Sequence, residues 1–177
     1  MAAVNPLSIS PYVATTGPEP HVSVPDDARA EVERLIFVYS YCWDGRDPEA
    51  TAALFTDDAV VEFYLDGAAE ATHGTVGREA LLEGMVKRTK MLELWRIETR
   101  HLMMNTVFGP THDDGLVQAV STAMIFWQRL PEDPRPLPIQ TGYYRSWCVD
   151  TPEGWRFRRR ETHMLGIFHP RFVYSGP

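Results

Sequence analysis

Hydrophobic and polar positions follow a helical period in the first quarter of this chain. After Pro25, apolar residues recur at i, i+3, i+4 and i+7, as expected for one buried helix face: Val32, Leu35, Ile36, Tyr39, Cys42 and Trp43. Pro25 and the acidic pair Asp26–Asp27 are residue types favoured where a helix begins, and Gly45 interrupts the pattern. The sequence therefore predicts a first helix that ends on a carboxylate, Asp44.

Two more helices are predicted before the β-rich second half of the chain begins. Asp47 and Pro48 form an N-terminal capping signal for a short helix, and residues 77–92 show a second apolar face built on Leu81, Leu82, Met85 and Val86. Between them, a turn at Thr56–Asp58 precedes a predicted strand over Val60–Leu65.

The second half of the chain favours strands. Four β-rich runs occupy residues 96–110, 116–131, 139–150 and 154–168, with turn signals at 109–115 and 150–154. The proline-dense stretch 131–138 is predicted to be a loop. This order indicates an α+β fold: a strongly curved, mostly antiparallel sheet whose concave side is covered by the helices, around a cone-shaped apolar pocket.

Composition separates a proline-rich N-terminal segment from the rest of the chain and limits the kinds of protein that the chain can be. Residues 1–25 contain five prolines and are predicted to form an extended arm, while residues 26–177 form one domain. A net charge of -7 argues against nucleic acid as a partner. We find neither a signal peptide nor an apolar run long enough to span a membrane, so a soluble, cytoplasmic protein is expected. The two cysteines, Cys42 and Cys148, are expected to be reduced.

The aspartate at the end of the first helix raises a chemical question. An ionised carboxylate among Tyr39, Tyr41 and Trp43 costs several kcal/mol unless it is paired. His101, within a β-rich run that is apolar on both faces, is one candidate partner. A carboxylate on one ring nitrogen would make the other nitrogen a better base. The alternative is a core histidine bonded to a backbone carbonyl, and spacing alone leaves both interpretations open.

Several segments resemble the SnoaL-like branch of the NTF2-like superfamily. The most specific are "DGRD…LFTDDAV" and "TRHLMMN", and the likeness extends from about Asp27 to Arg160. This branch includes scytalone dehydratases, bile-acid dehydratases and hexachlorocyclohexane dehydrochlorinases, which carry an Asp–His pair. The resemblance implies the cone-shaped NTF2-like fold, with Asp44 and His101 as the catalytic pair. It also implies a catalytic role for Tyr39, as in the bile-acid type.

Further residues are candidates for binding a substrate. Scytalone dehydratase uses a second histidine on the next strand, where this chain offers Met124, Phe126 and Trp127, so we expect a larger and more apolar pocket. The predicted substrate-binding residues are Tyr64, Met103, Asn105, Trp127, Tyr143 and His163. Either Tyr143 or Tyr144 should face inward, because neighbouring residues of a strand point to opposite faces. Each candidate also has a purely structural interpretation, such as an edge aromatic or a residue that satisfies the backbone.

These observations lead to a functional hypothesis with two rivals. We expect a cofactor-independent lyase, isomerase or cyclase acting on a hydrophobic polycyclic small molecule, without a metal, since metal-binding motifs are absent from the sequence. The chain could instead be a scaffold like the small β subunits of ring-hydroxylating dioxygenases, or a protein that binds a small molecule without chemistry. A homo-oligomer, either a dimer or a trimer, is expected to cover the exposed sheet face and the arm.

Overall fold

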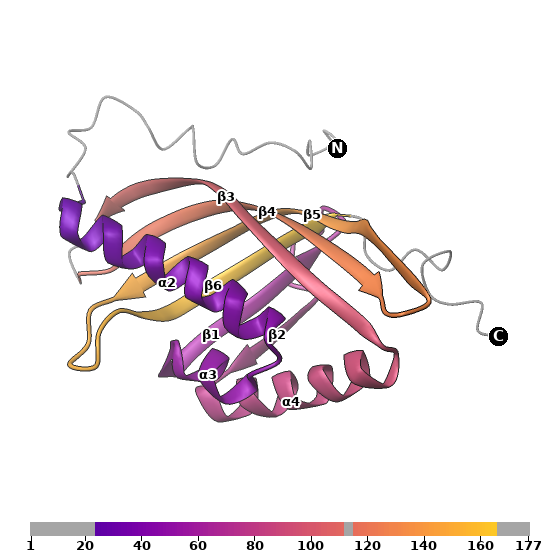
Figure 1. The fold of residues 1–177 in the computed structure, drawn as a ribbon. Coiled ribbons are helices and arrows are strands. Elements are labelled where there is room, and N and C mark those ends of the chain that lie inside the picture. Colours follow the sequence, from indigo (N-terminus) through magenta and orange to yellow (C-terminus); the bar gives the residue numbers. More distant parts are fainter. Residues whose placement is uncertain (1–23, 112–114, 166–177) are drawn as a thin grey trace.

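The computed structural model describes residues 24–111 and 115–165 and has the α+β architecture predicted from the sequence (Figure 1). The sheet has six strands in the order β2-β1-β6-β5-β4-β3. Neighbouring strands are antiparallel except β1 and β6, which are parallel. The element bounds are α2 (Asp26–Asp44), α3 (Pro48–Ala53), β1 (Phe55–Leu65), β2 (His73–Val76), α4 (Arg78–Leu94), β3 (Ile97–Thr111), β4 (Val117–Arg129), β5 (Asp133–Val149) and β6 (Arg156–Leu165).

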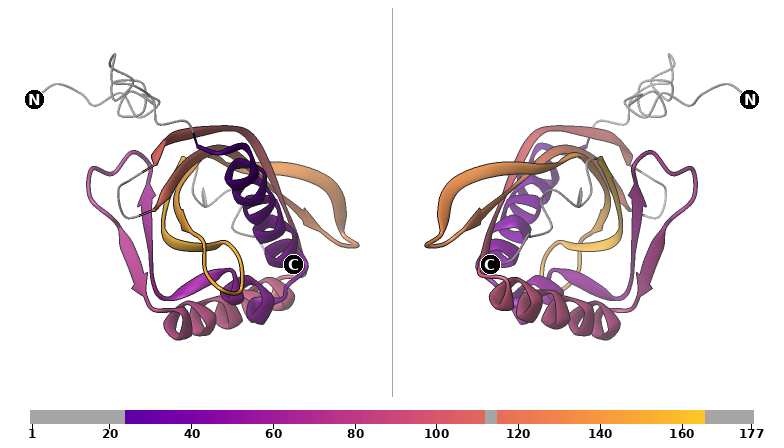
Figure 2. Two further views of the ribbon diagram at one scale, coloured as in Figure 1. Left: turned by 90° about the vertical axis from the view of Figure 1, so that its left-hand side faces the viewer. Right: turned by 90° about the vertical axis from the view of Figure 1, so that its right-hand side faces the viewer.

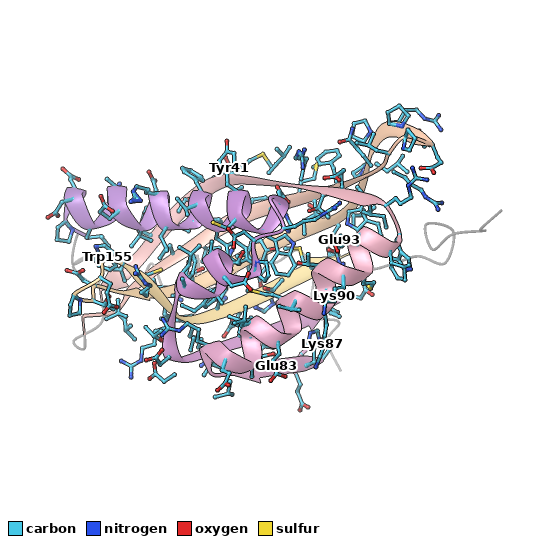
Figure 3. All side chains as sticks on the ribbon, turned by 60° about the horizontal axis from the view of Figure 1, so that its bottom comes forward. Tyr41, Glu83, Lys87, Lys90, Glu93 and Trp155 are labelled. Carbon is cyan, nitrogen blue, oxygen red and sulfur yellow. The ribbon has the colours of Figure 1, made fainter. Side chains whose placement is uncertain are left out.

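The sheet is strongly curved and does not close. Seen along its length, it arches over an interior that α4 bounds from below, while α2 lies against the concave side near β3 (Figure 2). One face of α4 supplies the buried residues Leu81, Met85 and Leu92. Its other side carries exposed charges, with Glu83, Lys87, Lys90 and Glu93 directed away from the body (Figure 3). The curved sheet and its helices thus create the cone that the sequence predicted.

Two apolar clusters fill the cone on either side of its middle. The larger packs α2 and α3 against the sheet around Ile36, Phe55 and Phe157, each at most 1% exposed. The smaller lies around Ile125, Trp127 and Met164. Burying each such side chain contributes roughly 1.5–3 kcal/mol, so the two clusters hold the walls apart and fix their separation.

The predicted helix boundaries agree with the structure. Asp47 caps α3 by accepting a hydrogen bond from the Ala50 amide at 2.8 Å, as its place before Pro48 predicted. The predicted hairpin turn at 150–154 also forms, closed by the Gly154 N–H donating to the Thr151 carbonyl. The predicted arm over residues 1–25 falls almost wholly outside the described residues.

Three strand predictions were wrong. β1 begins at Phe55, so the expected turn at Thr56–Asp58 is strand, with a bulge before Val60. β2 was not predicted at all. The stretch 131–138 is mostly strand, because β5 begins at Asp133 and pairs there with β4. Within residues 24–111 and 115–165, β5 pairs with β6 only from Thr141 onward, so the prolines of this stretch have β4 as their one described neighbour, and a missing N–H on the other side costs little.

Candidate active site

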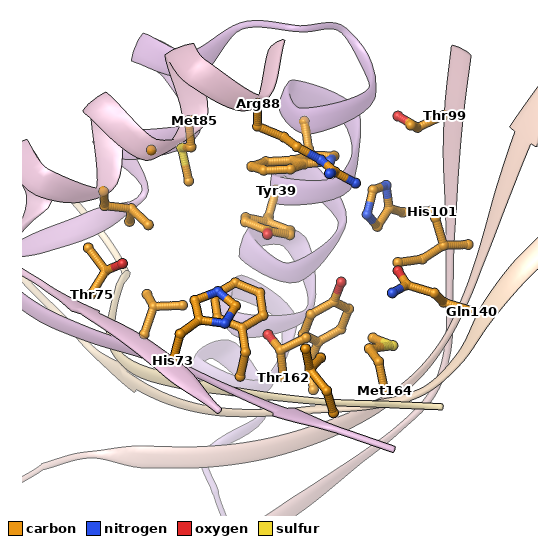
Figure 4. A pocket seen from close by; sticks show the side chains of 18 of the residues that line it. Tyr39, His73, Thr75, Met85, Arg88, Thr99, His101, Gln140, Thr162 and Met164 are labelled. Atoms are coloured by element: carbon orange, nitrogen blue, oxygen red, sulfur yellow. The ribbon is translucent and has the colours of Figure 1, made fainter. Parts of the chain in front are cut away.

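An apolar cavity of about 380 Å³ lies between the concave face of the sheet and helices α2 and α4 (Figure 4). Both helices and all six strands contribute to its wall, so its shape depends on the whole fold. The volume falls in the range of small-molecule sites, which are mostly apolar with a few convergent polar groups. The polar groups here come from Tyr39, Arg88, His101, Gln140 and Tyr144.

Asp44 and His101 are in direct contact at this wall. The Asp44 Oδ1 atom lies 2.6 Å from His101 Nδ1, and the His101 side chain is only 5% exposed. Asp44 also accepts the backbone N–H of His101 at 2.8 Å and the hydroxyl of Thr99 at 2.9 Å. Three hydrogen bonds compensate the carboxylate for its lost hydration. Since Nδ1 is engaged with Asp44, Nε2 is the ring nitrogen left for chemistry.

Local sequence explains why the end of α2 meets β3 at this point. Gly45 follows Asp44 and lies so close to the preceding turn that a Cβ would be 3.0 Å from the Tyr41 carbonyl oxygen. Arg46, at a φ of 58°, then turns the chain and donates to the Ile97 carbonyl and the Glu98 carboxylate, each at 2.7 Å. These bonds fasten the helix end to the start of β3, three and four residues before His101.

Aromatic rings surround the pair. Trp43 presents its edge to the His101 ring, with centroids 6.1 Å apart, and Tyr39 stacks on Trp43 at 6.2 Å. Tyr39 is 9% exposed and lines the cavity. Burial raises the pKa of its phenol, so the hydroxyl remains a hydrogen-bond donor across the neutral pH range.

A buried arginine lies beneath the two inward tyrosines. Arg160 is 1% exposed, and its guanidinium carbon lies 3.8 Å from the Tyr39 ring centroid and 4.1 Å from that of Tyr144. Within the described residues, none of its three guanidinium nitrogens has a hydrogen-bond partner. Burial raises the pKa of both phenols, and the Arg160 charge opposes that rise. The cation–π contacts, worth about 2 kcal/mol or more when desolvated, hold the two rings in place.

Of the predicted substrate-binding residues, only Trp127 lines the cavity. Met103 points to the same side of the sheet but packs between the two core clusters. Asn105 is exposed and has a φ of 50°, at a bulge between Met104 and Val107. The bulge reverses the alternation of β3, so Asn105, contrary to the prediction, does not line the cavity.

Tyr64, Tyr143 and His163 lie on the opposite face of the sheet, away from the cavity. Their rings form a stack across three strands, with centroids 4.4 Å apart for Tyr64–His163 and 4.6 Å for Tyr143–His163. The register pairs His163 with both tyrosines, whereas Tyr144, the neighbour of Tyr143, faces the cavity. Placing these three residues in the pocket was therefore incorrect, and the inward member of the tyrosine pair is Tyr144.

Several polar wall residues were not predicted, and Tyr144 was predicted only as one of two alternatives. Those missed are Arg88, Gln140, His73, Thr75, Thr99 and Thr162. Arg88 had a signal, because it lies three residues after Met85 and seven after Leu81 on the apolar face of α4. His73 is exposed but also stacks on Phe63, with ring centroids 4.3 Å apart at the cavity wall. The burial of Arg160 had no clear signal in the sequence. A shift of register near Arg159 breaks the alternation of inward and outward side chains within the arginine-rich segment Arg156–Arg160.

Three further expectations can be compared with the described part of the chain. Across residues 24–111 and 115–165, no cluster of three or more His, Cys, Asp or Glu side chains is arranged to hold a metal ion. None of the helices described has the length and apolar character needed to cross a bilayer. Cys42 and Cys148 are both free thiols.

Comparison with known families identifies the chain over most of its length. The model of the SnoaL-like domain matches residues 27–161. This protein belongs to the SnoaL-like family. The match supports the NTF2-like superfamily proposed from the sequence and covers every element described above except the end of β6. A comparison with curated proteins finds no significant match.

Solved structures with the same fold come from several bacterial proteins. One is the β subunit of a proposed aromatic-ring-hydroxylating dioxygenase from Novosphingobium aromaticivorans, with a TM-score of 0.66 and 20% identity over 81% of this chain and 92% of that one. ActVI-ORFA from Streptomyces coelicolor matches with a TM-score of 0.64 and 21% identity, over 79% of this chain and 95% of that one. A proposed scytalone dehydratase from N. aromaticivorans matches with a TM-score of 0.61 and 25% identity, over 80% of this chain and 87% of that one. These structures share the fold and differ in what they are reported to be.

Proposed function

We propose that this SnoaL-like protein is a cofactor-independent lyase, isomerase or cyclase that removes a proton from a carbon next to a carbonyl group. The single observation that carries the proposal is the 2.6 Å contact between Asp44 and His101 at the wall of an apolar cavity. A general base needs a fixed tautomer and a dry site within reach of its substrate. The hydrogen bonds to Asp44 and the rings of Trp43 and Tyr39 supply both.

The chemical step can be written from the residues present. His101 Nε2 accepts the proton as the C–H bond breaks, and the electron pair moves onto the carbonyl oxygen to give an enolate. The Tyr39 hydroxyl donates a hydrogen bond to that oxygen, with Tyr144 as the neighbouring phenol. The enolate then expels a β-leaving group that departs with the proton held by His101, takes that proton back at another carbon, or attacks a second carbonyl whose oxygen receives the proton. These outcomes correspond to a lyase, an isomerase and a cyclase.

The apolar wall favours a hydrophobic polycyclic substrate. Phe63, Leu65, Ile125 and Trp127 offer flat and branched surfaces, and a cavity of about 380 Å³ accommodates two or three fused rings. Binding such a molecule excludes the remaining water, which strengthens each hydrogen bond to the developing oxyanion.

Proton exchange with solvent tests this proposal without knowledge of the natural substrate. In D₂O, the wild-type protein should incorporate deuterium next to the carbonyl of a fused-ring ketone such as 2-tetralone, as measured by NMR. His101→Gln should lower the rate of exchange to background, and Tyr39→Phe should lower it roughly 10- to 1000-fold by removing one oxyanion donor. Tyr143→Phe, on the far face of the sheet, is the matched control and should exchange at the wild-type rate.

Equal exchange rates for wild type and His101→Gln would refute the proposal and favour a protein that binds without chemistry. The scaffold alternative is supported by the likeness to the dioxygenase β subunit, which at 20% identity concerns the fold alone. It predicts that the chain co-purifies with a larger iron–sulfur subunit, and that loss of the Asp44–His101 contact leaves this association unchanged.

A further inference from the structure

Arg88 occupies a position on α4 where the helix pattern calls for an apolar residue. The inward row of this helix runs Leu81, Met85, Arg88 and Leu92, and its other three members are buried apolar side chains. A hydrophobic residue would stabilise this face, whereas an arginine loses hydration there. Burial accordingly lowers the pKa of the Arg88 guanidinium. A cation kept at such a position suggests a role in binding.

The Arg88 side chain is held at the cavity wall and aimed at the reactive histidine. Its guanidinium lies 5.7 Å from the centroid of the Trp127 ring, and Nη1 donates to the Met91 sulfur at 3.9 Å. A thioether is a weak acceptor, so this contact mainly fixes the orientation of the guanidinium plane. Arg88 and His101 point toward one another across the cavity (Figure 4).

We propose that Arg88 binds a carboxylate of the substrate, so that the cavity is selective for polycyclic carboxylic acids over their neutral analogues. A planar guanidinium matches a carboxylate with two parallel hydrogen bonds, and this pair gains strength in an apolar surrounding. The rings of such a ligand would lie against the apolar wall. Its carboxylate would meet Arg88 at the end of the cavity that holds His101.

The negative charges of the chain and of Asp44 make a local cation necessary if an anionic ligand is to bind in the cavity. The chain has a net charge of -7, and Asp44 places a carboxylate at the same end of the cavity. An anionic ligand without a local positive charge would be repelled by both. Arg160 contributes a second cation, but it is enclosed by Tyr39, Tyr144 and Phe157 and is not among the residues that line the cavity. Among the arginines that bear on the cavity, Arg88 is the one exposed to a ligand.

This inference deepens the proposed function and rests on it only for the reacting carbon. A carboxylate held by Arg88 would place the adjacent carbons next to His101 Nε2, where proton removal is proposed. Carboxylate binding itself needs only the cation and the apolar wall. The two proposals can therefore fail separately.

Calorimetric titration with a matched pair of probes tests the inference. We expect wild type to bind 2-naphthoate about 10- to 100-fold more tightly than 2-naphthamide, which has the same shape without the charge; this is the size of one charge-assisted hydrogen bond. Arg88→Gln should bring the ratio of the two dissociation constants close to one. Arg88→Lys should retain part of the preference, because it keeps the charge and loses the planar fork.

Lys87→Gln is the control, since it removes a charge from the exposed side of the same helix, where Lys87 pairs with Glu83 at 3.8 Å. It should leave the preference unchanged. Arg88→Met, which preserves volume, should fold at least as well as wild type and also lose the preference. Equal wild-type affinities for both probes, no binding of 2-naphthoate at millimolar concentration, or a preference that survives Arg88→Gln would each overturn the inference.

Discussion

Asp44 combines a stability cost with a chemical role. It is the last residue of α2, and a negative charge at a helix C-terminus is unfavourable by about 0.3–1 kcal/mol. Its three hydrogen bonds come from Thr99 and His101, both on β3. The carboxylate therefore joins two elements and sets the tautomer of the imidazole, and the second effect can be isolated by mutation.

Asp44→Asn should impair chemistry much more than folding. The amide keeps the shape of the carboxylate. When its oxygen accepts the backbone N–H of His101, its NH₂ group faces Nδ1 and cannot accept the Nδ1–H, so the imidazole should move its proton to Nε2 and cease to be a base. The exchange rate is expected to fall about 10²- to 10⁴-fold, the usual contribution of a general base. Nitrogen NMR of the imidazole reports the tautomer directly. An unchanged tautomer together with an unchanged rate would contradict the role assigned to Asp44.

At the level of single residues, the sequence could predict which residues meet, but rarely to which face of a strand a side chain points. The pairing of Asp44 with His101 followed from a helix end, a β-rich run and a family resemblance. Asn105 was misplaced because a bulge, which no local residue pattern announces, reverses the alternation of β3. Tyr143 and Tyr144 could not be separated, because only the register with β6 decides which ring faces the cavity.

Helix α4 illustrates how a single element trades stability for shape. Gly84 lies within this helix and lines the cavity, and a Cβ built on it would meet nothing within 4 Å. Glycine in a helix interior is destabilising by roughly 0.5–1 kcal/mol relative to alanine. Its presence keeps the cavity wall open at this point.

Gly84→Ala should therefore raise the free energy of unfolding by about 0.5–1 kcal/mol, as measured by urea denaturation. Gly142→Ala provides the contrast. There a Cβ would lie 1.9 Å from the His163 carbonyl oxygen, so the β5–β6 pairing must shift and the protein should lose stability. A destabilised Gly84→Ala would show that the helix backbone at this point is already under constraint.

Helices with a strong apolar periodicity were predictable, whereas the edge strand β2 and the start of β5 were not. The three helices in the described part of the chain were located from apolar spacing and capping residues. β2 was missed because its four residues carry no apolar alternation. The start of β5 was taken for a loop because proline density does not reveal whether a strand has a neighbour on one side or on both.

At the scale of the whole molecule, the two faces of the sheet serve different purposes. The concave face forms the cavity, and the opposite face carries a polar network around Glu161, which is 6% exposed. Glu161 contacts Arg145 at 3.2 Å, Arg159 at 3.1 Å and His163 at 3.1 Å. Arg159 also pairs with Glu62 of β1 at 2.7 Å, so the network spans β1, β6 and β5, the strands that frame the cone. The overall shape was predicted from the order of elements, whereas this network depends on cross-strand register and was not. The homo-oligomer expected to cover this face stays a prediction.

Because Glu161 is buried at the centre of this network, stability should depend on pH in a definite direction. Burial alone would raise the pKa of Glu161, but the hydrogen bond with His163 and the charges of Arg145 and Arg159 outweigh it and lower that pKa below the ordinary value. A carboxyl group whose pKa is lower in the folded state stabilises the protein above its unfolded pKa, about 4.3 for glutamate, and this contribution is lost as the pH falls through the folded value. Urea unfolding at pH 7 should show Glu161→Gln less stable than wild type, and the difference should shrink steadily below about pH 4. Glu153→Gln, in the exposed turn between β5 and β6, should match wild type throughout. A difference between Glu161→Gln and wild type that stayed constant down to pH 2 would mean that Glu161 contributes through packing and not through its charge.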